Sequence, residues 1–231
     1  MKIRNLLFIL STLVVLLSAC STPAERVIKY TTNDNGVIEF TDGKFGEAKL
    51  VSNKYNKKEQ CFFAKFDKEI NVIGKEAFSG CKSLLSITLP ESITSIEEGA
   101  FCDCESLKSI EIPNGVTSIG KRAFRGCRSL VELTIPSCIT KIENYCFTWC
   151  TGLRSIVIPE GVTSIGNGAF MLCEGLTNVK IPNSVINIGA HAFEDCTNLN
   201  YVDVPNRNAV VDESAFNFNT VERFLRSKYG F

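Results

Sequence analysis

The sequence of 231 residues has little histidine, tryptophan or methionine: one, one and two, respectively. A single imidazole leaves little material for a metal cluster or a histidine-based catalytic site. No sign of charge dominates, because 25 lysines and arginines stand against 25 aspartates and glutamates, and no basic tract occurs. The long-range attraction for phosphate on which nucleic-acid binding depends is therefore missing, and we expect no nucleic-acid partner.

Long apolar runs are lacking after the N-terminus. Two basic residues precede an apolar stretch over residues 6–17, and Ser18-Ala19-Cys20 follows it. This order of charged, apolar and small residues is typical of a secretory signal peptide. The stretch is shorter than the roughly 20 residues that a membrane-spanning helix needs.

The ending Leu17-Ser18-Ala19-Cys20 resembles the lipobox of bacterial lipoproteins. The resemblance implies that residues 1–19 are a lipoprotein signal peptide and that the lipidated Cys20 anchors the chain to a membrane of the bacterial envelope. Residues 20–26 then form a short polar tether. An ordinary secretory peptide with an incidental cysteine is the alternative. Only Glu25 is acidic in this tether, so the side of the envelope on which the chain lies stays open.

A strict repeat of 23 residues organises the rest of the chain. Phenylalanine recurs seven times at this spacing, and cysteine, leucine and proline recur six times each. The phenylalanines are Phe78, Phe101, Phe124, Phe147, Phe170, Phe193 and Phe216, and the cysteines are Cys81, Cys104, Cys127, Cys150, Cys173 and Cys196. The pattern defines seven units, from 64–86 to 202–224.

Each unit contains two short extended segments. In one unit Ile110 and Ile112 alternate with polar residues, which predicts a short strand with one buried face. Pro113 ends the strand because proline has no N–H for a ladder. A second extended segment over 116–119 closes at Gly120, where glycine suits a turn with positive φ.

The rest of the unit has a longer apolar period. Cys127 follows Ala123 by four residues and Phe124 by three, and Leu130 follows Cys127 by three. This spacing predicts a helical or 3₁₀ turn that points Phe124 and Cys127 inward. Such a unit cannot close a core alone, so we expect the units to stack. The predicted fold class is a β-rich α+β repeat solenoid of the leucine-rich-repeat kind, with short strands and 3₁₀ or helical turns.

The motif Leu-x-x-Ile-x-Ile-Pro, followed by Val-Thr-Ser-Ile-Gly-x-x-Ala-Phe-x-x-Cys, resembles the BspA-like leucine-rich repeats of bacterial surface proteins. The resemblance covers about residues 64–216. It implies a cell-surface or secreted binding protein, with adhesion to host matrix or plasma proteins among the known roles.

The two ends are predicted to cap the stack. Residues 27–63 are predicted to form an N-terminal β cap, in which 27–30 and 37–40 form a hairpin around the turn 33–36. After Phe216 the register fails, and apolar residues at helical steps predict a C-terminal helical cap over 217–231.

The cysteines of the repeat are expected to be buried free thiols. They lie in one column with parallel Cα–Cβ bonds, which disfavours the approach that a disulfide needs. Cys61, Cys102, Cys138 and Cys146 fall outside the repeat. Cys102 with Cys104, or Cys146 with Cys150, could suggest a metal site, but such a site needs about four convergent ligands, and no second pair at matching spacing occurs. We therefore expect neither a metal nor another cofactor.

The positions that vary between units lie on the outward side of the first strand. Two columns result: Thr88, Glu111, Thr134, Val157, Lys180 and Asp203, beside Ser86, Ser109, Glu132, Ser155, Asn178 and Tyr201. Extended solenoid faces serve as binding surfaces. The candidate partner-binding residues are Glu111, Glu132, Thr134, Val157, Asn178, Lys180, Tyr201 and Asp203. Val157 and Tyr201 are the expected anchors, although a solvated face without a ligand explains any single position equally well.

The sequence thus favours a binding protein over an enzyme. His191, two residues before Phe193, is expected to be an exposed surface residue without a nucleophile or orienting carboxylate beside it. Our leading hypothesis is a lipid-anchored envelope protein, at the outer membrane or cell surface, whose solenoid binds another protein. If the solenoid faces outward, this partner can be a host protein. The alternative is a structural or assembly role, in which the domain faces inward and docks an envelope partner of the same cell.

Overall fold

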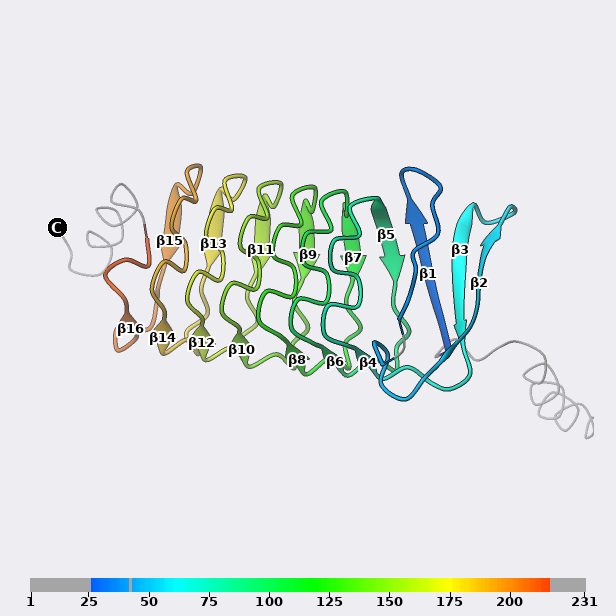
Figure 1. Ribbon diagram of the computed structural model, residues 1–231. Helices are drawn as coiled ribbons and strands as arrows, with labels where there is room; N and C mark the ends of the chain where they lie inside the picture. The colour runs from blue at the N-terminus through cyan, green and yellow to red at the C-terminus, as the bar shows by residue number, and fades with distance from the viewer. Residues whose placement is uncertain (1–25, 42, 217–231) are drawn as a thin grey trace, which may run out of the picture.

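The computed structural model describes residues 26–41 and 43–216 and shows an elongated stack of sixteen short strands (Figure 1). The strands are β1 Val27–Thr32, β2 Leu50–Asn56, β3 Cys61–Phe66, β4 Val72–Ile73, β5 Leu84–Thr88, β6 Ser95–Ile96, β7 Ser109–Glu111, β8 Ser118–Ile119, β9 Glu132–Thr134, β10 Lys141–Ile142, β11 Ser155–Val157, β12 Ser164–Ile165, β13 Asn178–Lys180, β14 Asn187–Ile188, β15 Tyr201–Asp203 and β16 Val210–Val211. From β4 onward they alternate between two rows that follow the long axis (Figure 1).

Strands of one row pair in parallel with a register shift of 23 residues. Ser155 of β11 lies opposite Asn178 of β13, and Ser164 of β12 lies opposite Asn187 of β14. The predicted solenoid is therefore confirmed, because each unit places the same positions beside its neighbour. The strand order is β2-β3-β1-β5-β7 and β15-β13-β11-β9 in one row, and β4-β6-β8 and β10-β12-β14-β16 in the other. Both rows are interrupted between the same two units, at β7/β9 and β8/β10.

The repeat phenylalanines form a continuous column through the core. Successive rings from Phe78 to Phe216 are nearly parallel, with centroids 5.1 to 5.6 Å apart. The six from Phe78 to Phe193 are at most 1% exposed. Since each ring covers the next, no unit can bury its phenylalanine without a neighbour.

The predicted helical or 3₁₀ turn around each phenylalanine is wrong, because no unit in the described chain forms a helix there. In the unit of Phe124, the N–H groups of Phe124 and Gly126 donate to the carbonyls of Cys146 and Thr148 in the next unit, at 2.9 and 2.8 Å. Arg122 and Gly126 have positive φ angles of 58° and 74°. With this backbone conformation, every second N–H group points along the stack axis toward the next unit. Hydrogen bonds to the next unit thus alternate with single turns inside the unit, in which the N–H of Cys127, for example, donates to the carbonyl of Phe124 at 3.2 Å. No continuous helical ladder forms, while the apolar spacing of three residues stays the same.

Glycine suits position 120 for a different reason from the one that the sequence indicated. Its φ is not in the positive region. A Cβ on Gly120 would lie 2.6 Å from the backbone nitrogen of Glu98, in the preceding unit. Close approach of two backbones, and not turn conformation, therefore favours glycine at this position.

The N-terminal cap contains a different hairpin from the predicted one. Strand β1 pairs antiparallel with β3 and with β5, while residues 37–40 form no strand. The hairpin is instead β2 with β3, and β3 extends past residue 63 to Phe66. The N–H of Ile38 donates to the hydroxyl of Tyr30 at 3.1 Å. Phe40 packs edge-on against Phe78, with ring centroids 5.4 Å apart, and so covers the end of the phenylalanine column.

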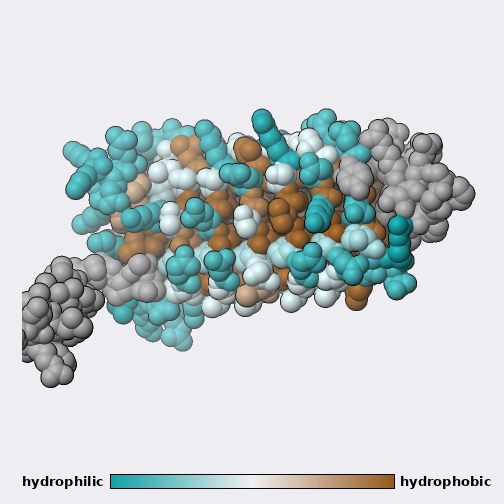
Figure 2. Space-filling model, turned by 180° about the vertical axis from the view of Figure 1, so that it is seen from behind, coloured by the Kyte–Doolittle hydropathy of each residue, from teal (hydrophilic) through white to brown (hydrophobic). Residues whose placement is uncertain are grey.

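The side of the stack that faces away from the viewer in Figure 1 carries a band of high hydropathy along the long axis, bordered by polar residues (Figure 2). Within the described ranges, no helix is both long and apolar enough to cross a membrane. The expected signal peptide, nearly all of the tether, Cys20 and the C-terminal cap over 217–231 lie outside the described residues.

Candidate functional site

The two outward columns predicted from the sequence lie in the row that contains β5, β7, β9, β11, β13 and β15, which we call the strand face. Parallel pairing places Glu132, Ser155, Asn178 and Tyr201 in one line. The second line consists of Thr134, Val157, Lys180 and Asp203. At the other end, Thr88 pairs with Glu111 in the same way. The register thus brings the candidate residues into two adjacent rows.

Most of these side chains point into solvent. Ile156 is 4% exposed, whereas Val157 beside it is 71% exposed. Glu111, Glu132, Thr134 and the candidates of β13 are exposed, and Asp203 is half-buried. Strand geometry explains this alternation, because successive side chains leave opposite faces of a sheet. The side chain of Tyr201 lies outside those that the structure describes.

A groove of about 660 Å³ runs over the strand face from β7 to β11. Its lining comprises Ser109, Glu111, Asn114, Glu132, Thr134, Ser155 and Val157, with the strand residues between them. β7 and β9 lie side by side here but belong to different sheets (Figure 1). Four of the eight candidate residues therefore share one hollow, at the place where the strand ladder is interrupted.

The groove combines negative charge with an apolar wall. Glu111 and Glu132 make no ion pair within residues 26–41 and 43–216. Val157 contributes a large exposed apolar side chain at the far side of the groove. Both carboxylates are therefore available to a ligand that also covers the valine.

Five of the six repeat cysteines are buried as expected, whereas Cys81 in the first unit is only half-buried. Cys104, Cys127, Cys150, Cys173 and Cys196 are buried free thiols, and each Sγ donates to the carbonyl oxygen of a phenylalanine in the preceding unit, at 3.0 to 3.2 Å. Burial raises the pKa of Cys150 and of Cys196 to about 12. These thiols stay protonated at neutral pH and are poor nucleophiles.

The four extra cysteines are spread over the molecule. Cys61 lies in the N-terminal cap, Cys138 is exposed, Cys146 is buried at the alanine position of its unit, and Cys102 is half-buried on the turns. In the described part of the chain no three histidine, cysteine or acidic residues are grouped so that they could hold a metal ion.

His191 lies on the outer side of a turn with its side chain 49% exposed, as the sequence predicted. Its Nδ1 is 3.1 Å from a carboxylate oxygen of Glu194, three residues later. The expectation that no carboxylate lies beside His191 is therefore wrong, because the two residues meet three positions apart on the same turn; the contact itself is a surface pair that includes no nucleophile.

Sequence reasoning missed a second group of residues, on the turns that carry the phenylalanine column. Trp149 lies beneath the guanidinium groups of Arg125 and Arg128, and Arg122 lies over Tyr145. The signal was present in the sequence, since the only tryptophan of the chain occurs one unit after four basic residues between 121 and 128. The period of 23 residues is needed to see that they meet.

Solved structures show the same architecture. A leucine-rich repeat protein from T. pallidum is 25% identical with a TM-score of 0.62, and the match covers 83% of this chain and 96% of that one. A leucine-rich repeat protein from Eubacterium ventriosum is 26% identical with a TM-score of 0.60, over 65% of this chain and 41% of that one. A third, from Bacteroides ovatus, is 25% identical with a TM-score of 0.52, over 73% and 48%. This chain thus spans less than half of the length of each of the latter two proteins.

No curated protein matches the sequence. The family described as the BspA type leucine-rich repeat region does match it, in six copies, over residues 49–148, 71–179 and 140–225. Since these ranges cover more than half of the chain and carry the 23-residue motif, the protein belongs to the BspA type leucine-rich repeat family.

Proposed function

We propose that this chain is a lipid-anchored envelope protein whose strand face binds another protein. Leucine-rich repeats generally mediate protein–protein interaction, and solenoids provide extended surfaces for it. The lipobox-like ending at Cys20 supports anchoring to the membrane, and membership of a family of bacterial repeat proteins supports display at the cell surface. The role is binding and not catalysis.

The groove across β7, β9 and β11 is the observation that carries the proposed binding site. It gathers Glu111, Glu132 and Val157 in one hollow of about 660 Å³. Exposed large apolar side chains near unpaired charges are typical of contact surfaces, where an apolar centre is surrounded by polar groups. The remaining candidates, Asn178, Lys180, Tyr201 and Asp203, continue the surface toward the C-terminal end of the row.

Site-specific photo-crosslinking tests this site. A photoreactive phenylalanine derivative replaces Val157 in one variant and Ile186 in a control variant. Both residues are exposed, at 71% and 58%, but Ile186 precedes β14 in the other row. The probes are activated in producing cells, alone and mixed with host plasma. A protein adduct from position 157 and not from position 186 supports the strand face, whereas equal adducts, or none from position 157, contradict it.

Protease treatment of intact producing cells tests anchoring and orientation, with Cys20→Ala as the unanchored control. The proposal predicts digestion of the wild-type domain on intact cells and release of the Cys20→Ala variant from the membrane fraction. Protection until the envelope is broken would instead favour the inward-facing assembly role and end the adhesion hypothesis. An unchanged membrane association of Cys20→Ala would contradict the lipid anchor.

A further inference from the structure

The outer positions of the turns change in character from one unit to the next. The units of Phe101, Phe124, Phe147 and Phe170 follow one another along the stack. Their outward residues are acidic in the first (Glu98, Asp103, Glu105), basic in the second (Lys121, Arg122, Arg125, Arg128) and aromatic in the third (Tyr145, Trp149), while the fourth presents Met171 and Leu172 together with Glu174, at the position of Arg128. On the turn side of the stack a basic unit is thus followed by an aromatic one and then by the apolar pair Met171 and Leu172.

Five of these residues make two sets of contacts, which together we call the basic–aromatic patch: Arg125 and Arg128 contact Trp149, and Arg122 contacts Tyr145. The Cζ atoms of Arg128 and Arg125 lie 4.7 and 5.8 Å from the ring centroid of Trp149. The Cζ of Arg122 lies 5.8 Å from the ring centroid of Tyr145. A guanidinium group held over an aromatic face keeps its N–H edge free for a planar anion such as a carboxylate.

The charges of the patch are only partly neutralised by the chain itself. Arg125 pairs with Asp103 at 3.4 Å. Arg122 and Arg128 make no ion pair with any residue that the structure describes. Glu105, the acid close to Arg128, is itself paired with Lys82 at 3.0 Å. Two guanidinium groups therefore remain available to a ligand.

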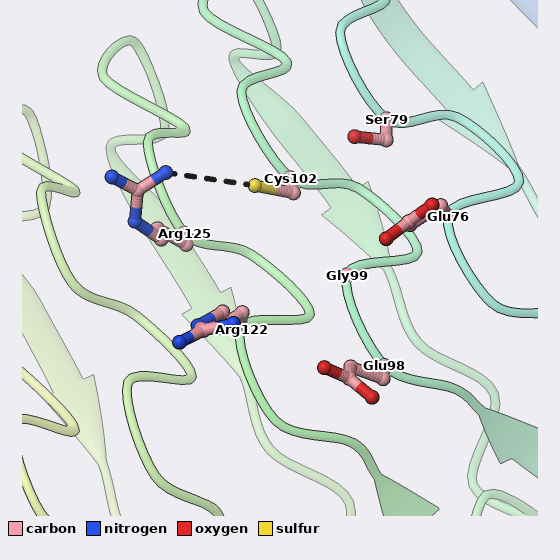
Figure 3. Close-up of a pocket in the computed structure, with 7 residues that line it drawn as sticks. All are labelled: Glu76, Ser79, Glu98, Gly99, Cys102, Arg122 and Arg125. Atoms are coloured by element: carbon pink, nitrogen blue, oxygen red, sulfur yellow. Dashed lines mark hydrogen bonds between the residues drawn. The ribbon is translucent and has the colours of Figure 1, made fainter.

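A hollow of about 380 Å³ adjoins the patch. Arg122 and Arg125 lie on one side of it, Glu76 and Ser79 on the other, and Gly99 between them (Figure 3). The hollow exists because Gly99 has no side chain where the next unit carries Arg122. A ligand can therefore reach the guanidinium groups from the side as well as from above.

The acidic side of the hollow restricts the class of ligand. A long polyanion such as a nucleic acid or a sulfated glycan would meet the carboxylate of Glu76, two units from Arg122, and that of Glu98, one unit away, which Lys75 pairs at 3.4 Å. Like charges at that distance oppose binding. On the opposite side, Trp149 is 37% exposed and Leu172 is half-buried, which suits an apolar side chain. The surface therefore fits a short segment that combines a carboxylate with a large apolar group.

We propose that the basic–aromatic patch is a second binding site, for an extended peptide segment in which Asp or Glu stands about three residues from an aromatic or large aliphatic residue. The carboxylate binds Arg128, while Arg122 of the same unit adds positive charge to this part of the surface, and the apolar side chain packs on Trp149 and Leu172. Two units of the stack span about 10 Å, which is the length of three extended residues. The site is separate from the strand face and does not depend on the function proposed for that face.

Selection from a random heptapeptide library displayed on phage tests the patch with the full chain as target. The double variant Arg122→Gln/Arg128→Gln is the counter-target, and Arg154→Gln, an exposed arginine outside the patch, is the matched control. We expect the enriched peptides to contain the acidic–apolar pair. Their enrichment should be at least tenfold weaker on the double variant and unchanged on Arg154→Gln. It should also be unchanged on Val157→Arg, which alters the strand face and not the patch. The urea midpoint of each variant confirms folding.

Fluorescence gives a second readout, because Trp149 is the only tryptophan in the chain. Titration with a selected peptide that lacks tryptophan should change the emission of Trp149 until it saturates. Replacing the acidic residue of the peptide by Gln or Asn should weaken binding at least tenfold. The proposal is overturned if no peptide is enriched, if enriched peptides lack the acidic–apolar pair, or if they bind the double variant equally well. Heparin that binds more tightly than every selected peptide, through the same arginines, would assign the patch to a polyanion instead.

Discussion

The thiol of Cys150 donates a hydrogen bond to the carbonyl oxygen of Phe124, 3.1 Å away and 26 residues earlier in the chain. The same carbonyl accepts the N–H of Cys127 at 3.2 Å. The cysteine column therefore joins each unit to the one before it, directly beside the phenylalanine column. This role explains why a thiol, and not only a small apolar group, suits the position.

Cys150→Ala should lower the free energy of unfolding by about 1–2 kcal/mol, because a buried hydrogen bond and the packing of the sulfur are both lost. The loss stays moderate because the carbonyl of Phe124 keeps the N–H of Cys127. Urea unfolding measures the difference. Cys138→Ala is the control, since Cys138 is exposed and its replacement should change stability by less than about 0.5 kcal/mol. Equal effects of both substitutions would contradict the assigned role.

Stability should fall as the pH rises above the ordinary thiol pKa of 9.0. Burial raises the pKa of Cys150 and Cys196 to about 12, so between these values the unfolded chain loses protons that the folded chain retains. Stability is thus complete below pH 9 and decreases toward pH 12, by up to about 1.4 kcal/mol per pH unit and thiol.

Comparison with Cys150→Ala/Cys196→Ala isolates this effect from the titration of lysines and tyrosines. Urea midpoints measured from pH 7 to pH 10.5 should decrease more steeply for the wild type than for the double variant. Parallel pH profiles would show that the two thiols do not carry the effect.

Phe147→Ala should cost about 3–5 kcal/mol, because it removes a ring from the middle of the stacked column. Phe147 is 0% exposed and contacts the rings of Phe124 and Phe170. Val157→Ala, at a position that is 71% exposed, serves as the control and should have little effect. A reversible melt in which Phe147→Ala loses less than about 1 kcal/mol would refute the role of the column.

Gly120→Ala should destabilise the stack by about 1–3 kcal/mol, because the added methyl would overlap the backbone of the preceding unit. The new Cβ would lie 2.6 Å from the backbone nitrogen of Glu98. Gly115→Ala is the matched control in the same unit, where the new Cβ would find its first contact at 3.5 Å. Thermal unfolding of the two variants should differ clearly, and equal melting temperatures would contradict the close approach.

The period of 23 residues was sufficient to predict the stack and the outward columns, because a constant spacing fixes which positions become neighbours. It placed Asn178 beside Ser155 and Lys180 beside Val157, as found. The groove could not be predicted, since it lies across the interruption between β7 and β9, two strands whose sequences give no sign of a break.

The turns and the cap show where the sequence was ambiguous. An apolar step of three residues, as between Phe124 and Cys127, suits a helix and a chain of tight turns equally well. The choice is made by hydrogen bonds to the next unit, such as that from Phe124 to Cys146. Likewise β1 has a plausible local partner in residues 37–40, but it pairs with β3 and β5, which are distant in the sequence.

Removal of one whole unit tests most directly the claim that the register of 23 residues builds this protein. Deleting residues 164–186 joins Thr163 to Asn187, which occupies the position of Ser164 beside Lys141. This variant should remain soluble and unfold cooperatively in urea. Deleting residues 164–185 leaves one residue more and shifts every later side chain to the opposite face, so cooperative unfolding should be lost. Equal behaviour of the two deletions, folded or unfolded, would contradict the account.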